Sequence, residues 1–178
     1  MTERDLVPDN KDWTWVLQRA CDECHLDVTS LDVTEIPSMI RHNAAAFAEL
    51  LGGDDTWLRT RPRPDKWSPL EYGFHVRDVY ELYHHRLGLM LEHEGPEYPN
   101  WDQDESALEK GYGRADPIAV AAELTQWAES LATLFETVDQ DGWTRTGYRS
   151  DGAAFTVESF ARYLIHDPVH HLWDVSTA

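Results

Sequence analysis

Apolar residues recur at helical spacing in four stretches of the chain. In the first stretch, Thr34 offers a cap, Pro37 follows it, and apolar positions continue from Met39 to Leu51, where Gly52-Gly53 ends the pattern. Spacings of three and four residues place such side chains on one face of a helix. A polar cap with a proline nearby is typical of a helix start. We therefore predict the first helix here.

The second stretch has the clearest helix start. Ser68 stands before Pro69 and three residues before Glu71, which is the pattern of a capping box with proline at the first helical position. Apolar positions then continue at helical spacing to about Glu94, where Gly95-Pro96 ends the pattern. We predict a long second helix.

The last two helices start in the same manner. Asp116 stands before Pro117, and the apolar spacing that follows extends a third helix to about Asp139. Thr156 caps a fourth helix, whose apolar face runs to Trp173. Side-chain acceptors at these positions satisfy the free N–H groups of a first turn. Four helices of this length predict an all-α fold, a four-helix bundle.

Three segments fall outside these helices. Residues 1–33 are rich in Asp and hold only one short apolar run, so we predict an irregular N-terminal arm that packs on a bundle formed by residues 34–178. Residues 97–115 are predicted to form a long polar loop, a type of loop that is often functional. Asp151-Gly152, among β-favouring residues, indicates a small hairpin before the last helix.

The charge balance narrows the choice of partners. The chain of 178 residues carries 15 Lys and Arg against 33 Asp and Glu, a formal net charge of −18. Nucleic acids and anionic membranes attract basic surfaces, so we expect neither as a partner. Two cysteines exclude a disulfide-rich scaffold, and we find no pattern of a signal peptide or of a membrane span. We expect a cytoplasmic protein, and a homodimer is one of the oligomeric states that the sequence allows.

The nine histidines are the most distinctive part of the composition. His166 and His170 are four residues apart on the fourth helix, so one face presents both imidazoles, whereas His171 points about 100° away. His75, two turns into the second helix, is the candidate third ligand. Three imidazoles are a donor set that catalytic zinc sites use. Chance spacing is the alternative, and we assign the other histidines to ordinary surface or partly buried positions.

Two further features leave alternatives open. Pro168 lies between the paired histidines, and it either bends the fourth helix or makes it restart with Asp167 as the cap; only a bend keeps the shared face. Cys21-x-x-Cys24 followed by His25 matches a haem attachment site, half of a zinc site with His25 as a ligand, or a redox pair. We predict instead a structural pair of cysteines in the arm.

The sequence WSPLE that leads to His75, together with His166-x-x-x-His170-His171, makes residues 34–175 resemble the DinB-like superfamily. Its relatives include the mycothiol-dependent maleylpyruvate isomerases and the bacillithiol S-transferases. The resemblance implies a four-helix bundle that holds a divalent metal, zinc or nickel, through one ligand on the second helix and an i, i+4 pair on the last. It thus implies His75, His166 and His170 as metal ligands. The sequence of the arm is not part of the general family pattern. It resembles the sequences of an actinobacterial subgroup of the family.

The resemblance and the ligand set together predict a chemistry. A low-molecular-weight thiol that reaches the metal would lose its proton, and the thiolate would attack an electrophilic carbon. We therefore predict a metal-dependent, mycothiol-type S-transferase or isomerase. Asp78, Asp174 and His171 are candidates for supporting the ligand imidazoles, with ordinary solvated acids as the alternative. The alternative function is a non-catalytic metal-binding stress or interaction protein.

Overall fold

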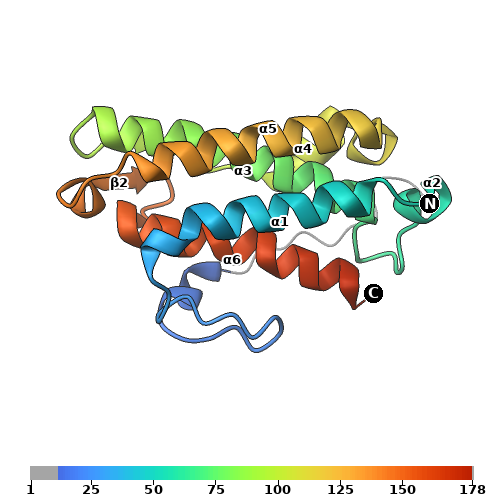
Figure 1. The fold of residues 1–178 in the computed structure, drawn as a ribbon, viewed down its shortest axis with the longest axis horizontal. Coiled ribbons are helices and arrows are strands. Elements are labelled where there is room, and N and C mark those ends of the chain that lie inside the picture. The colour runs from blue at the N-terminus through green and yellow to red at the C-terminus, as the bar shows by residue number, and fades with distance from the viewer. Residues whose placement is uncertain (1–11, 178) are drawn as a thin grey trace.

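Four long helices lie side by side in the computed structural model, which describes residues 12–177 (Figure 1). They are α1 (Ile36–Leu51), α3 (Pro69–Glu92), α5 (Pro117–Glu136) and α6 (Val157–Ser176). Helix α5 packs along both α1 and α3, and α6 packs against the same two helices. The predicted all-α four-helix bundle is confirmed.

The helix starts follow the caps in the sequence. The side chain of Ser68 accepts a hydrogen bond from the N–H of Glu71, whose carboxylate accepts one from the N–H of Ser68. The caps predicted for α5 and α6 are also formed. The first helix begins at Ile36, one residue later than the Thr34 cap predicts, because a 3₁₀ turn over Val33–Glu35 precedes it.

Residues 97–115 correct the prediction of a long polar loop. They contain strand β1 (Glu97–Tyr98), helix α4 (Gln103–Lys110) and a 3₁₀ turn. The predicted hairpin is present, since β2 (Thr146–Arg149) pairs antiparallel with β3 (Ala154–Thr156). Strand β1 adds a parallel third strand beside β2. The small sheet lies at one end of the bundle (Figure 1).

The core of the bundle is apolar. Phe47, Tyr80, Phe135 and Phe160, one from each long helix, are fully buried, and burial of such surface is the main force that holds the helices together. A short helix, α2 (Asp55–Arg59), follows α1. None of the helices between residues 12 and 177 has the length and apolar character that crossing a membrane requires.

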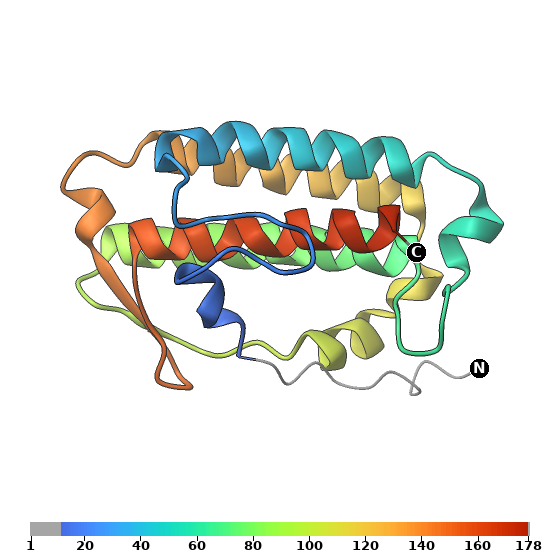
Figure 2. The ribbon, with the colours of Figure 1, turned by 90° about the horizontal axis from the view of Figure 1, so that it is seen from below.

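The described part of the arm runs beside α6 (Figure 2). It starts with a 3₁₀ helix over Trp13–Leu17 and buries Val16 and Val28 in the core of the bundle. Arg162 of α6 donates a hydrogen bond to the carbonyl oxygen of Val28 at 2.5 Å. These contacts attach the arm to one side of the bundle. Residues 1–11 of the predicted arm lie outside the described residues.

Helix α6 continues through Pro168 without a break. The alternative of a restart with Asp167 as the cap is therefore wrong. Asn43 of α1 donates a hydrogen bond to the carbonyl oxygen of Pro168 at 2.8 Å, and the hydroxyl of Tyr80 on α3 donates to the Oδ1 of Asn43, also at 2.8 Å. Buried hydrogen bonds thus join three helices at the turn that carries the paired histidines.

Candidate metal centre

Helix α6 contributes to two separate groups of metal-binding side chains. The inner cluster consists of His75, Asp167 and His171, and the arm cluster consists of Cys21, Cys24, His166 and His170. Within each cluster the donor atoms lie within 4.8 Å of one another. The trio of ligands predicted from the sequence is therefore divided: His75 lies in the inner cluster, and His166 and His170 lie in the arm cluster.

The donor atoms of the inner cluster converge around one carboxylate oxygen. The Nε2 of His75 is 3.2 Å from the Oδ1 of Asp167, and the Nε2 of His171 is 3.8 Å from the same oxygen. The two imidazole rings lie 4.8 Å apart and are nearly perpendicular, at 87°. Two ring nitrogens and one oxygen thus face a common point between α3 and α6.

These separations fit a metal ion. Zinc binds imidazole nitrogen at about 2.0–2.1 Å and carboxylate oxygen at a similar distance, so tetrahedral ligands lie about 3.4 Å from one another. The distances of 3.2 and 3.8 Å in the inner cluster bracket that value. Two imidazoles and a carboxylate are also a ligand set of catalytic zinc sites, which keep a further position open.

The packing around His75 explains why its ring is fixed. The capping box at the start of α3 places this residue two turns into the helix. The ring is fully buried, with Trp101 stacked on it at a centroid distance of 5.4 Å and Trp67 at 5.1 Å. Rigid aromatic walls of this kind hold a ligand in one orientation before a metal arrives.

The electrostatics of the inner cluster favour a positive charge beside Asp167. Burial lowers the pKa of His75, so its imidazole is neutral at neutral pH. Burial alone would raise the pKa of Asp167, but the neighbouring His75 and His171 outweigh it, and the net shift is downward. The pKa of His171 is raised: burial opposes the charged ring, and Asp167 and Asp174 more than compensate. Together these shifts give an ionised carboxylate between two imidazoles.

Asp174 contacts His171 in the way expected of a supporting carboxylate. Its Oδ2 is 3.1 Å from the Nδ1 of His171, and its Oδ1 accepts a hydrogen bond from the Nζ of Lys66 at 2.6 Å. Its Oδ2 also lies 3.7 Å from the Nε2 of His170, one of the ligands predicted from the sequence. Such a contact fixes the orientation of the ring, leaving Nε2 of His171 for the metal.

Asp78 makes different contacts. It accepts hydrogen bonds from Arg77, Lys110 and the hydroxyl of Tyr112 at 2.6, 2.7 and 2.6 Å. Among the described residues, the Nδ1 of His75 has no hydrogen-bond partner. Asp78 therefore joins α3 to the end of α4 and to the 3₁₀ turn that follows it, and among the described residues no hydrogen bond links it to His75.

The arm cluster brings the cysteines to the same turn of α6. The Sγ of Cys21 is 3.7 Å from the Nδ1 of His170, and the rings of His166 and His170 lie 5.1 Å apart. Trp13 covers both rings, at centroid distances of 5.5 and 5.2 Å. His25, the third ligand in the half-site alternative, is exposed and does not belong to the cluster.

A cavity of about 1170 Å³ opens beside the inner cluster. Asp167 and His171 line it, together with Tyr72, Arg86 and Trp101. The volume exceeds the range of about 300–1,000 Å³ that is typical of small-molecule sites. The inner cluster therefore has access to a space large enough for more than one small molecule.

Sequence reasoning did not identify Asp167 or the cysteines as partners of the histidines. The signal for Asp167 was present, because Asp167 and His171 have the same four-residue spacing as His166 and His170. Spacing alone could not decide which pair faces α3. That choice depends on the rotation of α6 about its axis, which packing determines.

Comparisons with known proteins agree with the fold. A family model described as the DinB superfamily matches residues 38–175. YfiT from Bacillus subtilis, described as a probable metal-dependent hydrolase with an unusual four-helix bundle topology, is similar with a TM-score of 0.64 and 19% sequence identity, over 99% of this chain and 92% of YfiT. No curated protein matches the sequence.

A mycothiol-dependent maleylpyruvate isomerase is also similar in structure, with a TM-score of 0.60 and 13% sequence identity. The match covers 84% of this chain and 61% of the isomerase. At these identities, the two structural likenesses concern the fold alone. The family model, in contrast, spans most of the sequence, including all of α3 and α5 and nearly all of α1 and α6. The chain therefore belongs to the DinB superfamily.

Proposed function

We propose that this protein is a divalent-metal-dependent enzyme that uses a low-molecular-weight thiol. It is either an S-transferase, which joins the thiol to an electrophilic carbon, or a thiol-dependent isomerase. His75, Asp167 and His171 hold the ion in this proposal, with zinc as the first candidate and nickel as the second. The observation that carries the proposal is the position of this donor set, which converges between two helices and opens on a large cavity. It revises the ligand set predicted from the sequence and retains His75.

A divalent ion in the inner cluster would supply Lewis acidity, which would lower the pKa of a bound thiol or water. The residues of the chain supply the rest. Asp167 keeps its negative charge beside both imidazoles, and Asp174 holds His171 in orientation. Trp101 and Trp67 cover His75 and exclude water from its ring.

Tyr72 is positioned to donate a hydrogen bond in the same cavity. Burial raises the pKa of its hydroxyl, and the nearby Asp174 raises it further. The phenol therefore stays protonated at neutral pH. Because Tyr72 lines the cavity beside Asp167 and His171, it can orient a substrate oxygen or a thiol there.

Arg86 indicates an anionic substrate. Only 5% of its surface is exposed, one terminal nitrogen donates to the carbonyl oxygen of Pro99 at 2.6 Å, and its buried Nε has no hydrogen-bond partner in the described part of the chain. It lines the same cavity, eleven residues after His75 on α3, which corresponds to about 16 Å along the helix. A carboxylate at this end would satisfy the guanidinium.

The size of the cavity supports two reactants. A thiol near the inner cluster and an electrophile that reaches toward Arg86 would share a space of about 1170 Å³. The likeness in fold to a mycothiol-dependent isomerase adds support for a thiol as the co-substrate.

The test uses full-length protein loaded with zinc or nickel and a panel of low-molecular-weight thiols with a model electrophile. We expect a thiol conjugate only when metal and thiol are both present. His75→Ala should lose one metal equivalent and reduce conjugation to background, whereas His85→Ala, an exposed histidine on the same helix outside both clusters, should change neither. Equal conjugation without metal, or none with any thiol, would overturn the proposal.

Arg86→Gln tests whether Arg86 binds a carboxylate of the substrate. We expect it to raise KM for a carboxylate-bearing electrophile about 10- to 100-fold, the value of a buried charge-assisted hydrogen bond, with a smaller effect on kcat. An uncharged electrophile of the same size is the control, and its KM should not change. Equal KM changes for both substrates would indicate a structural role for Arg86 instead.

Hydrolysis is the second candidate function. The likeness to YfiT, described as a probable metal-dependent hydrolase, covers nearly the full length of both chains, and a metal-activated water would use the same donor set. Metal-dependent cleavage of ester or amide substrates in the absence of any thiol would favour it. A protein that binds metal tightly and converts neither kind of substrate would favour the non-catalytic alternative.

A further inference from the structure

We propose that the arm cluster is a second metal site, a structural zinc site of the Cys₂His₂ type that fastens the N-terminal arm to α6. Cys21 and Cys24 come from the arm, and His166 and His170 come from the helix, with all four donor atoms within 4.8 Å of one another. The site is independent of the proposed enzyme function. No ligand is shared between the two clusters.

The distances in the arm cluster match tetrahedral zinc. Zinc binds thiolate sulfur at about 2.3 Å and imidazole nitrogen at about 2.0–2.1 Å, which places sulfur and nitrogen about 3.6 Å apart. The Sγ of Cys21 is 3.7 Å from the Nδ1 of His170. Two thiolates and two imidazoles complete the four-coordinate set that structural zinc sites use.

A buried polar atom in the cluster lacks a partner. Only 4% of the surface of His166 is exposed, and its Nε2 is buried without a hydrogen-bond partner among the described residues. Leaving such an atom unpaired costs about 1–3 kcal/mol. A zinc ion would supply the missing contact.

The backbone of the arm holds the two cysteines close enough together to bind one ion. The N–H of Cys21 donates to the carbonyl oxygen of Leu26 at 3.0 Å, and the N–H of His25 donates to the carbonyl oxygen of Cys21 at 3.1 Å. His25 adopts the left-handed conformation, with φ of 61°. This tight turn brings Cys21 and Cys24 to the same side, and the four-residue spacing on α6 does the same for the two histidines.

The surroundings indicate a structural site that is covered by the arm on one side and borders the cavity on the other, where His166 and His170 are part of the lining. Cys21 and His170 are 2% and 5% exposed, and Trp13 covers the histidine rings. With four protein donors, no position remains for a substrate. The ion would fix the arm, whose Trp13 and Glu23 line the cavity beside the inner cluster. In this proposal, the ion holds one part of the cavity wall in place but supplies none of the reacting groups.

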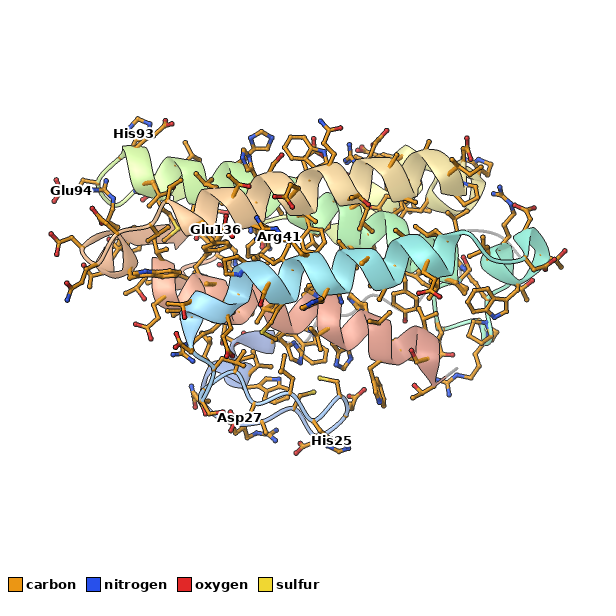
Figure 3. The ribbon with its side chains drawn as sticks, viewed as in Figure 1. His25, Asp27, Arg41, His93, Glu94 and Glu136 are labelled. Atoms are coloured by element: carbon orange, nitrogen blue, oxygen red, sulfur yellow. The ribbon has the colours of Figure 1, made fainter. Side chains whose placement is uncertain are left out.

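The experiment measures zinc per chain in full-length protein by elemental analysis. We expect two equivalents in the wild type and one in the double variant Cys21→Ser/Cys24→Ser. His25→Asn is the matched control, because it tolerates the left-handed backbone and removes an imidazole that points away from α6 (Figure 3); it should retain two. An unchanged zinc content in the double variant would overturn the proposal.

Cobalt substitution in the wild type keeps the test independent of whether the double variant folds. We expect the intense near-ultraviolet band of a cobalt–thiolate bond with the visible bands of a tetrahedral site. His75→Ala should retain this thiolate band while losing the other equivalent, which separates failure of this proposal from failure of the proposed function. A cobalt-loaded wild type without the thiolate band would contradict the proposal.

Thiol labelling gives a third measurement. In the zinc-loaded wild type, both cysteines should resist alkylation, and a chelator should accelerate their labelling at least tenfold. Labelling at the same rate with and without the chelator would show that burial alone protects the cysteines, and the proposal would fail.

Discussion

Consecutive residues of one helical turn take part in different chemistry in this protein. His166 and Asp167 differ by about 100° around the helix axis, and each is paired with a residue four positions later, His170 and His171. One pair faces the cysteines of the arm, and the other faces His75 on α3. The turn therefore presents two donor sets side by side.

Asp174 supplies the first prediction at this scale. Asp174→Asn removes the charge that holds His171 and Lys66, so we expect the metal affinity of the inner cluster to fall about 10- to 100-fold. Competition with a chromophoric chelator measures this affinity. Asp78→Asn is the control: it should lower stability through Lys110 and Tyr112 but leave metal affinity unchanged. Equal losses of affinity in both variants would contradict the assignment.

His166 supplies a prediction on pH. Burial, with a further contribution from His170, lowers the pKa of His166 from 6.5 to about 4. In metal-free protein, the unfolded state therefore binds a proton between pH 6.5 and about 4 that the folded state does not. Stability is full above pH 6.5 and falls as the pH drops through this window, by up to about 3 kcal/mol.

Urea unfolding of metal-free protein between pH 4 and 7 checks this prediction. His166→Gln cannot ionise, so its stability should depend less on pH than that of the wild type. Parallel curves for the two proteins would show that another group controls the acid sensitivity.

At the scale of elements, α6 remains intact although it contains proline. Pro168 cannot donate a hydrogen bond to the carbonyl oxygen of Leu164, yet the helix is continuous from Val157 to Ser176. Asn43 supports this turn by donating to the carbonyl oxygen of Pro168 and accepting from Tyr80. A polar bridge from α1 and α3 thus fixes the part of α6 that carries the ligands.

Asn43→Ala tests this bridge. The change leaves the buried hydroxyl of Tyr80 without its acceptor, so we expect a loss of about 1–3 kcal/mol in the free energy of unfolding, measured with urea. Tyr80→Phe and the double variant complete the cycle. We expect the double variant to lose less than the sum of the two single losses. Strict additivity would mean that the hydrogen bond between these residues contributes nothing.

The elements also show where local patterns are sufficient. Ser68, Asp116 and Thr156 start their helices as predicted, because a cap acts within four residues of itself. Strand β1 could not be predicted in this way, since its two residues pair with Tyr148 and Arg149 some fifty positions later. Helix α4 is short and has no buried residue, so its apolar spacing carried little signal.

At the scale of the molecule, the arm and the bundle form one structure around the cavity. Arm residues Trp13 and Glu23, bundle residues of α3 and α6, and α4 all contribute to its lining. Away from the cavity, Arg41 of α1 forms ion pairs with Glu129 and Glu136 of α5 (Figure 3). The arm therefore contributes to the side of the bundle that holds the cavity, whereas ion pairs hold α1 and α5 together.

Limited proteolysis tests the coupling of the arm to the arm cluster. Arg19 is exposed and lies two residues before Cys21. We expect trypsin to cleave after Arg19 at least tenfold faster when a chelator removes zinc, because cleavage follows local opening. Cys21→Ser/Cys24→Ser should be cleaved quickly with or without the chelator. A cleavage rate in the wild type that ignores the chelator would argue against a zinc-held arm.

The sequence by itself determined the helices, their caps and the four-residue spacings that place imidazoles on shared faces. These are local properties, decided by residues within one or two turns of each other. Only the tertiary structure decided which of two equally spaced pairs, His166 with His170 or Asp167 with His171, faces His75, and that the cysteines of the arm meet the other pair. The reason is physical: the rotation of α6 and the path of the arm are fixed by packing and buried hydrogen bonds between segments far apart in the chain.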